Sequence, residues 1–281
     1  MNSALTDKYL NLQENLRQYG SAIVAFSGGI DSSLVAYVAG QTLGEQALAV
    51  TSASASLKRA DLELAKRLAT DWGIRHQVIV TDEMSREEYR QNPTNRCFYC
   101  KTSLYTYLDE LAETTDIEVV LNGTNTDDLG DHRPGLIAAN NFAVRSPLAE
   151  CGFNKQDIRD LAHHLGLENA DKPQAACLSS RFPYGTEITL ELLDQVERAE
   201  EVLTDLGFAQ CRVRHHGAIA RLEVPTEQLQ QAIERHAELN QRLCDAGYTY
   251  VTLDLAGFQS GSLNKQLIAD QITMVELHEP Q

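Results

Sequence analysis

The sequence predicts an α/β protein with a parallel, doubly wound sheet and a small C-terminal α+β domain. Up to residue 165, short apolar runs alternate with segments of helical periodicity, the pattern of a parallel sheet that helices cover on both faces. After residue 185 this alternation gives way to a helix, a hairpin and a second helix. The stretch between them, 171–185, is rich in Pro, Ser and Gly, which favours a functional loop and a domain junction. We therefore expect domains at 1–175 and 176–281.

The first domain is expected to begin with an amphipathic helix over 1–20. Strands are then expected at 21–26, 47–51, 77–80 and 117–121, alternating with helices at 31–43, 59–72, 101–113 and 154–165. Asn154 is a suitable N-cap for the last of these helices, because its side chain can accept from an N–H of the first turn. Parallel sheets of this kind bind ligands at the carboxyl ends of their strands.

The second domain has a different pattern. Helices are expected at 189–206 and 226–246. Between them, 211–215 and 218–224 have the pattern of a hairpin that turns at His216-Gly217. The segment 248–255 alternates like a further strand, which completes a small α+β unit.

Composition restricts the partners. The chain has 24 Lys and Arg against 40 Asp and Glu, a formal net charge of −16, which disfavours a large nucleic-acid partner. No apolar run approaches the roughly 20 residues that span a bilayer, and the N-terminus lacks the features of a signal peptide. We therefore expect a cytoplasmic protein without a membrane partner. The six cysteines should remain thiols there, and close pairs of them indicate metal binding or sulfur chemistry.

The strongest motif is the hexapeptide SGGIDS at 27–32, between a strand and a helix. Its glycines allow positive φ and close approach to a ligand, and N–H groups at a helix N-terminus form an anion site. It is neither a Walker A loop nor GxGxxG. The alternative is a tight turn without a ligand. The hexapeptide resembles the signature of the PP-loop ATP pyrophosphatases, or adenine nucleotide alpha hydrolase-like proteins, which implies cleavage of ATP to an adenylate and pyrophosphate.

Two further loops follow strands on the expected ligand side. The segment 51–54 should lie near the adenosine, and 122–131 follows the fourth strand. Asp127 and Asp128 could hold Mg²⁺, although a solvated loop with Asx turns would have the same sequence. The expected nucleotide-binding residues are Ser27, Gly28, Gly29, Asp31, Ser32, Thr51, Ser52, Asn122, Thr124 and Asp127, with Asp31 and Asp128 as Mg²⁺ ligands.

Three of the six cysteines lie in segments that suggest metal binding or sulfur chemistry. Cys97 and Cys100 form a CxxC pair at the start of a helix, and Cys177 lies in the junction loop. A CxxC pair alone fits a redox pair, zinc ligands or cluster ligands. Three thiolates could hold a [4Fe-4S] cluster whose open iron carries an extra sulfide. Alternatively Cys177 acts alone, with Arg181 lowering its pKa, or the cysteines are structural.

Six segments resemble the LarE family of sulfur transferases: 25–36, 95–101, 122–128, 176–189, 212–224 and 253–264. The resemblance implies adenylation of pyridinium-3,5-biscarboxylic acid mononucleotide by ATP, followed by displacement of AMP by sulfur, in nickel-pincer cofactor biosynthesis. In members with one active-site cysteine, that residue gives up its sulfur and becomes dehydroalanine; Cys177 occupies its position. Cys97 and Cys100 match the three-cysteine members, so we expect a [4Fe-4S] cluster on all three.

The same resemblance indicates a substrate site in the second domain and a homo-oligomer, with a hexamer as the implied state. Arg212 and Arg214 alternate on one strand and therefore share a face, from which they could grip the substrate phosphate. Ser180 and Arg181 are expected to assist. Spacing alone is nearly as typical of a solvated basic strand face, and the resemblance favours the substrate site.

Three other functions compete with sulfur transfer to the mononucleotide. A PP-loop tRNA thiolase also uses cysteines, but the net charge of −16 argues against an RNA partner. An amidotransferase-type ligase such as NAD synthase would give the three cysteines no role. The third alternative is not an enzyme but a cluster carrier or nucleotide sensor.

Overall fold

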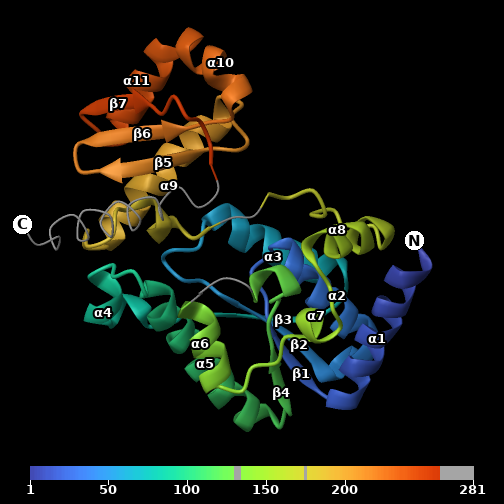
Figure 1. Ribbon diagram of the computed structural model, residues 1–281. Coiled ribbons are helices and arrows are strands. Elements are labelled where there is room, and N and C mark those ends of the chain that lie inside the picture. The colour runs from blue at the N-terminus through green and yellow to red at the C-terminus, as the bar shows by residue number, and fades with distance from the viewer. Residues whose placement is uncertain (130–133, 174–175, 260–281) are drawn as a thin grey trace, which may run out of the picture. The chain divides into compact units, whose positions relative to one another are not determined.

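The computed structural model describes residues 1–129, 134–173 and 176–259 (Figure 1). The chain divides into two compact units, 1–175 and 176–281, and each is described by itself. The end of the sixth sequence segment above, 260–264, lies outside the described residues. No helix in the described part of the chain is long and apolar enough to cross a membrane.

The first unit is built on a four-stranded sheet in the order β3-β2-β1-β4 (Figure 1). Its strands are β1 (Ala22–Ala25), β2 (Ala47–Ser52), β3 (Arg75–Ile79) and β4 (Val119–Leu121). Every neighbouring pair is parallel, which confirms the predicted doubly wound fold. The chain winds outward from β1 to β3 and then returns to place β4 on the other side of β1. The direction of winding therefore reverses between β1 and β4, and ligands bind in sheets of this type at such a point.

Helices connect the strands and cover the sheet. They are α1 (Ser3–Tyr19), α2 (Ile30–Leu43), α3 (Arg59–Asp71), α4 (Glu87–Arg90), α5 (Arg96–Thr115), α6 (Pro134–Asn141), α7 (Pro147–Glu150) and α8 (Lys155–His164), with 3₁₀ turns η1 (Gly44–Gln46), η2 (Glu83–Ser85) and η3 (Thr126–Asp128). The Asn154 side chain accepts from the N–H of Asp157, so the predicted N-cap is confirmed. The sequence analysis missed α4, α6 and α7, which are too short for helical periodicity to stand out.

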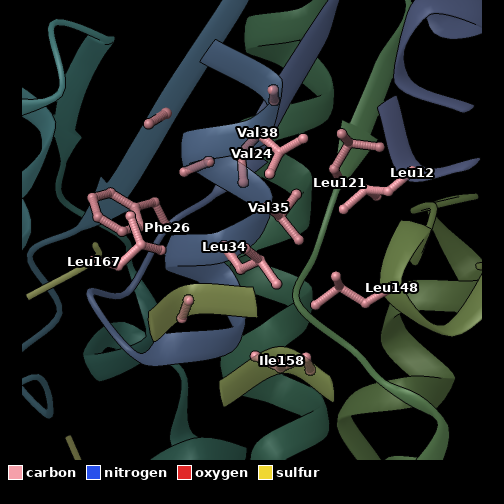
Figure 2. Close-up of a cluster of buried hydrophobic side chains, with 14 of the residues drawn as sticks. Leu12, Val24, Phe26, Leu34, Val35, Val38, Leu121, Leu148, Ile158 and Leu167 are labelled. Carbon is pink, nitrogen blue, oxygen red and sulfur yellow. The ribbon is translucent and has the colours of Figure 1, made fainter. Parts of the chain in front are cut away.

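Alternate strand residues face two different core clusters. In one cluster, Val24 of β1 and Leu121 of β4 pack with Leu34, Val35 and Val38 of α2 (Figure 2). The opposite face of the sheet packs Ile23, Leu48 and Val50 against α5 and α6. Apolar side chains thus cover both faces of the central strands, which leaves the ends of these strands for polar ligands.

The second unit contains a three-stranded sheet in the order β5-β6-β7. Its elements are η4 (Leu178–Arg181), α9 (Leu190–Asp205), β5 (Arg212–His216), β6 (Ile219–Glu223), η5 (Thr226–Gln228), α10 (Leu229–Glu234), α11 (His236–Asp245) and β7 (Tyr250–Leu253). The antiparallel pairing of β5 with β6 confirms the predicted hairpin, and β7 pairs with β6 in parallel.

The prediction of one helix over 226–246 is wrong. The helix is interrupted at Arg235, whose φ of −94° and ψ of 14° lie outside the helical range. The Arg235 guanidinium donates to the carbonyl of Leu206, at 2.6 Å, and His236 Nδ1 lies 2.9 Å from the carbonyl of Ile233. Side chains that bond to backbone carbonyls in this way compete with the helical ladder.

Candidate active site

The glycine turn lies between β1 and α2. Gly28 has a φ of 70°, and Gly29 is the N-cap of α2. The hydroxyl of Ser32 accepts from the N–H of Ser27, at 3.2 Å, and donates to the carbonyl of Gly29, at 3.0 Å. These bonds hold the turn closed, while the first N–H groups of α2 have no partner within the helix. The turn therefore presents several backbone donors and the positive end of the helix dipole to an anion.

The loop that follows β4 lies directly against this turn. A Cβ atom at Gly123 would lie 2.7 Å from the nitrogen of Ser32 and 2.9 Å from the carbonyl carbon of Asp31. No real side chain tolerates such distances, so only glycine allows this approach. The Asn125 amide donates to Asp31 across the same contact, at 3.4 Å. The structure thus brings together the two loops that sequence analysis assigned to the nucleotide.

A lysine that sequence analysis missed completes this cluster. The Lys155 ammonium forms a salt bridge with the Asp31 carboxylate. The backbone N–H of Lys155 also donates to Asp127, at 2.9 Å, and the N–H of Asn125 donates to Asp128, at 3.2 Å. Asp127 and Asp128 therefore hold backbone N–H groups, and Asp31 has a cationic partner. The only local signal for Lys155 was its place directly after the N-cap Asn154.

Other expected nucleotide residues are bonded within the protein. Asn122 Oδ1 accepts from the N–H of Thr124 and from the hydroxyl of Ser146, both at 2.9 Å. The buried Thr51 hydroxyl donates to the carbonyl of Phe26, at 2.7 Å. These contacts fix the shape of the loops around the glycine turn.

Thr51 also shares a hydrogen bond with His76. Its hydroxyl proton is used on Phe26, so the hydroxyl can only accept from His76 Nε2, which lies 2.8 Å away and must carry the proton. Burial, aided by the charge of Lys66, lowers the pKa of His76 and favours this neutral form. The next predicted residue, Ser52, shares a hydrogen bond of 2.7 Å with Thr81.

Two more residues that contact the glycine turn were also missed. Asn169 donates to the carbonyl of Gly28, at 3.1 Å, and to the hydroxyl of Ser33, at 2.8 Å. Lys172 forms a salt bridge of 2.8 Å with Asp61 and lies 3.4 Å from the Gly28 carbonyl. Lys172 belongs to the loop 171–185 that sequence analysis marked as functional, and that was its only signal.

The cysteine pair lies where it was expected, in the first turns of α5. Cys97 is exposed and Cys100 is partly buried. Three residues apart on a helix, they lie on one face, and a helix N-terminus favours thiolates. Among the described residues, no group of three or more His, Cys, Asp or Glu side chains is arranged to hold a metal ion.

In the second unit, Cys177 immediately precedes η4, which ends at Arg181. The Arg181 guanidinium binds both carboxylate oxygens of Glu200, at 2.8 and 3.0 Å. The two side chains are only 3% and 2% exposed. Burial lowers the pKa of Arg181, but the charge and hydrogen bonds of Glu200, together with the thiols of Cys177 and Cys211, outweigh it, so the pKa is raised. Arg181 is thus a permanent cation beside Cys177.

A second buried ion pair lies on the hairpin. Arg214 of β5 binds both carboxylate oxygens of Glu223 of β6, at 3.0 and 2.9 Å. Arg212, on the same strand face, differs: its guanidinium donates to the carbonyl of Gln259, at 3.1 Å, and stacks 4.4 Å above the ring of Phe258. In the described part of the chain it has no carboxylate partner. Burial and the nearby charges of Arg214 and Arg181 lower the pKa of Arg212 to about 10.

The parallel sheet with a glycine turn at its winding reversal, and the polar loops gathered on that turn, define an enzyme of the PP-loop ATP pyrophosphatase superfamily. The family model for NAD synthase matches residues 5–97, which include the glycine turn.

Three relatives match nearly the whole chain. The pyridinium-3,5-bisthiocarboxylic acid mononucleotide synthase of Lactiplantibacillus plantarum is 37% identical over 96% of this chain and 98% of its own length. The uncharacterized protein slr1717 of Synechocystis is 47% identical, over 90% and 97%. The uncharacterized protein MJ0830 of Methanocaldococcus jannaschii is 29% identical, over 90% and 98%. The chain belongs to the LarE family, that of the pyridinium-3,5-bisthiocarboxylic acid mononucleotide synthase.

Proposed function

We propose that the protein is an ATP-dependent sulfur transferase that converts pyridinium-3,5-biscarboxylic acid mononucleotide to its thiocarboxylate form in nickel-pincer cofactor biosynthesis. The observation that carries the proposal lies in the second unit: the backbone of Cys177 is bonded to a buried arginine of a site that also holds Arg212 and Arg214. The sulfur atom of Cys177 and arginine side chains that suit an anionic substrate thus belong to the same unit. The name of the relative that is 37% identical supplies the substrate class.

The first step of the proposed reaction is adenylation. A carboxylate oxygen of the substrate attacks the α-phosphorus of ATP, and the bond to pyrophosphate breaks, giving an acyl adenylate. The glycine turn supports this step, because it offers backbone N–H donors that suit the phosphates. Mg²⁺ would supply charge neutralisation at phosphate oxygens, and Asp31 and Asp128 are its proposed ligands. Both carboxylates are part of the polar cluster at the turn, which is a suitable oxygen donor set.

The second step is sulfur transfer. A sulfur nucleophile attacks the carbonyl carbon of the adenylate, and AMP leaves with the original oxygen. Repeating both steps at the second carboxylate gives the dithio form. We assign the substrate phosphate to Arg212, Arg214 and Ser180. Arg212 is the strongest candidate, because it is buried and, within the described residues, forms no salt bridge with a carboxylate.

We further propose that Cys97, Cys100 and Cys177 hold a [4Fe-4S] cluster, which when bound would supply sulfide as a renewable sulfur source. Cys97 and Cys100 suit this role, because both lie on one face at the start of α5. The cluster and its thiolates belong in the reducing cytoplasm. The competing mechanism is sacrifice of the Cys177 sulfur. We also propose a homo-oligomer, with the hexamer that the family resemblance implies, and sedimentation analysis tests this state.

The deciding experiment starts with anaerobic purification, iron and sulfide analysis, and incubation with ATP, Mg²⁺, sulfide and the mononucleotide. The proposal expects repeated turnover, AMP and pyrophosphate as products, and an unchanged mass of the peptide that contains Cys177. The Cys97→Ser/Cys100→Ser variant should lose iron and turnover but keep substrate-dependent pyrophosphate release. If the Cys177 peptide of the wild type loses the mass of hydrogen sulfide, the transferred sulfur comes from Cys177 itself and the cluster mechanism is wrong. If ATP cleavage responds to tRNA and not to the mononucleotide, the mononucleotide is not the substrate of this enzyme.

A further inference from the structure

The hydrogen-bonding capacity of Arg181 is almost fully used within the protein. A guanidinium carries five N–H donors. Nε and Nη2 each donate to Glu200. Nη1 lies near three acceptors: the carbonyl of Ala176 at 2.7 Å, the carbonyl of Cys177 at 3.1 Å and the hydroxyl of Ser180 at 2.9 Å. At most one N–H remains for any ligand, so Arg181 is poorly suited to grip a phosphate.

Glu200 in turn links Arg181 to the rest of the second unit. It projects from α9, and its Oε1 also accepts from the backbone N–H of Val213 on β5, at 3.0 Å. A single carboxylate thus joins the helix, the hairpin and the turn that follows Cys177. Because Glu200 is 2% exposed, this junction is shielded from water. Hydrogen bonds in such a buried environment are electrostatically stronger than in water.

Arg214 holds the same turn from the hairpin. Its Nη1 donates to the carbonyl of Ser180, at 2.6 Å, while its Nε and Nη2 each donate to Glu223. The carbonyls of Ala176, Cys177 and Ser180 are therefore all bonded to buried arginines, and each arginine is oriented by its own glutamate. The turn is bound at both ends of η4 to groups whose positions the surrounding unit determines.

We propose that the Arg181–Glu200 pair is a positioning device for Cys177 and not a substrate ligand, an inference that rests on the proposed sulfur transfer. The pair holds the main chain on both sides of the Cys177 side chain and so sets the position of Sγ. A buried ion pair is weak evidence for stability, since apolar replacements of equal volume are often as stable. Stability alone therefore does not explain the Arg181–Glu200 pair, whereas positioning of Cys177 does. Sulfur transfer needs such control, because a misplacement of about 1 Å can lower a rate about 100-fold.

The test compares Arg181→Lys, which keeps the charge but loses the forked geometry, and Glu200→Gln, which keeps the shape but loses the charge. In both we expect the Kd of the mononucleotide and the rate of pyrophosphate release to stay within about twofold of the wild type. Transfer of sulfur from the preformed complex, measured in a single turnover, should fall about 100-fold. Arg212→Gln is the matched comparison, with the opposite pattern: a Kd raised about tenfold or more.

A second measurement does not require sulfur transfer. Hydrogen exchange should become about tenfold faster at residues 176–182 of Arg181→Lys, since the local bonds weaken, while exchange in α11 stays unchanged. Unchanged exchange at 176–182, or an increase throughout the second unit, overturns the positioning role. So does a mononucleotide Kd raised about tenfold in Arg181→Lys with normal single-turnover transfer, because Arg181 would then be a substrate ligand. If the wild type makes no thiocarboxylate at all, the proposed function fails while the exchange result still decides whether Arg181 holds the turn.

Discussion

The ammonium of Lys155 forms a salt bridge with the carboxylate of Asp31, and the two side chains are 23% and 22% exposed. Asp31 lies in the first turn of α2, beside the glycine turn, and Lys155 begins α8. The pair thus places a cation at the expected phosphate site and neutralises an aspartate that would otherwise repel ATP.

This relationship predicts the behaviour of Lys155→Met. Without the ammonium, the partly buried Asp31 carboxylate faces the phosphates alone, and we expect the Kd of ATP to rise about tenfold. Isothermal titration with a non-hydrolysable ATP analogue in the absence of Mg²⁺ measures it, so that the proposed role of Asp31 as a Mg²⁺ ligand does not enter. Lys66→Met is the control, because Lys66 forms an exposed pair with Glu63. Adding Asp31→Asn to Lys155→Met should recover part of the affinity, and strictly additive effects would contradict a coupled pair.

Gly123→Ala is expected to distort the glycine turn. The new Cβ would lie 2.7 Å from the nitrogen of Ser32, so the first turn of α2 must shift. We expect pyrophosphate release to fall more than about tenfold, because the N–H donors would move away from the phosphates. Gly152→Ala is the matched control: its φ is 71°, but nothing lies within 4 Å of the added atom. It should lose about 1 kcal/mol of stability and keep its activity.

The buried Arg214–Glu223 pair gives a stability prediction. Glu223→Ala leaves the buried Arg214 without its main counter-ion, and we expect the free energy of unfolding to fall by about 3 kcal/mol. Glu238→Ala breaks an exposed pair with Arg235 and should cost at most about 0.5 kcal/mol. Urea unfolding followed by circular dichroism measures both. Equal losses in the two variants would show that burial of the first pair has no energetic consequence.

The pKa of Arg212, lowered to about 10, predicts a pH dependence of binding. A bound phosphate favours the cation, so the affinity for inorganic phosphate should weaken as pH rises through about 10. The effect on folding has the opposite sign: burial penalises the charged folded form, so this group's contribution to stability increases as pH rises from about 10 towards its ordinary pKa. Titration calorimetry from about pH 8 to about pH 11 measures the affinity for phosphate, which should not change with pH in Arg212→Gln.

Local sequence was enough to predict much of the fold. The apolar periodicity located the strands and long helices of the sheet because burial on a helix or strand repeats at short, regular intervals. The N-cap Asn154 was also predictable, since its partner Asp157 is a near neighbour in the chain. The cysteine pair and the arginines of β5 were found in the same way, from spacing within one element.

Other predictions failed where distant residues decide the outcome. The continuous helix over 226–246 was a reasonable expectation from periodicity, but Arg235 binds the carbonyl of Leu206, 29 residues away. Short α4, α6 and α7 have too few residues to show a period of their own.

By itself, the sequence determined the alternation of strands and helices, the glycine turn between β1 and α2, and the residue types available for phosphate and sulfur chemistry. Only the tertiary structure decided that Lys155 pairs with Asp31 across 124 residues and that Arg181 uses its donors on Glu200 and the Cys177 turn. The physical reason is that periodicity and capping act over a few residues, whereas a side chain's partners depend on which distant segments the packed core brings within hydrogen-bonding distance.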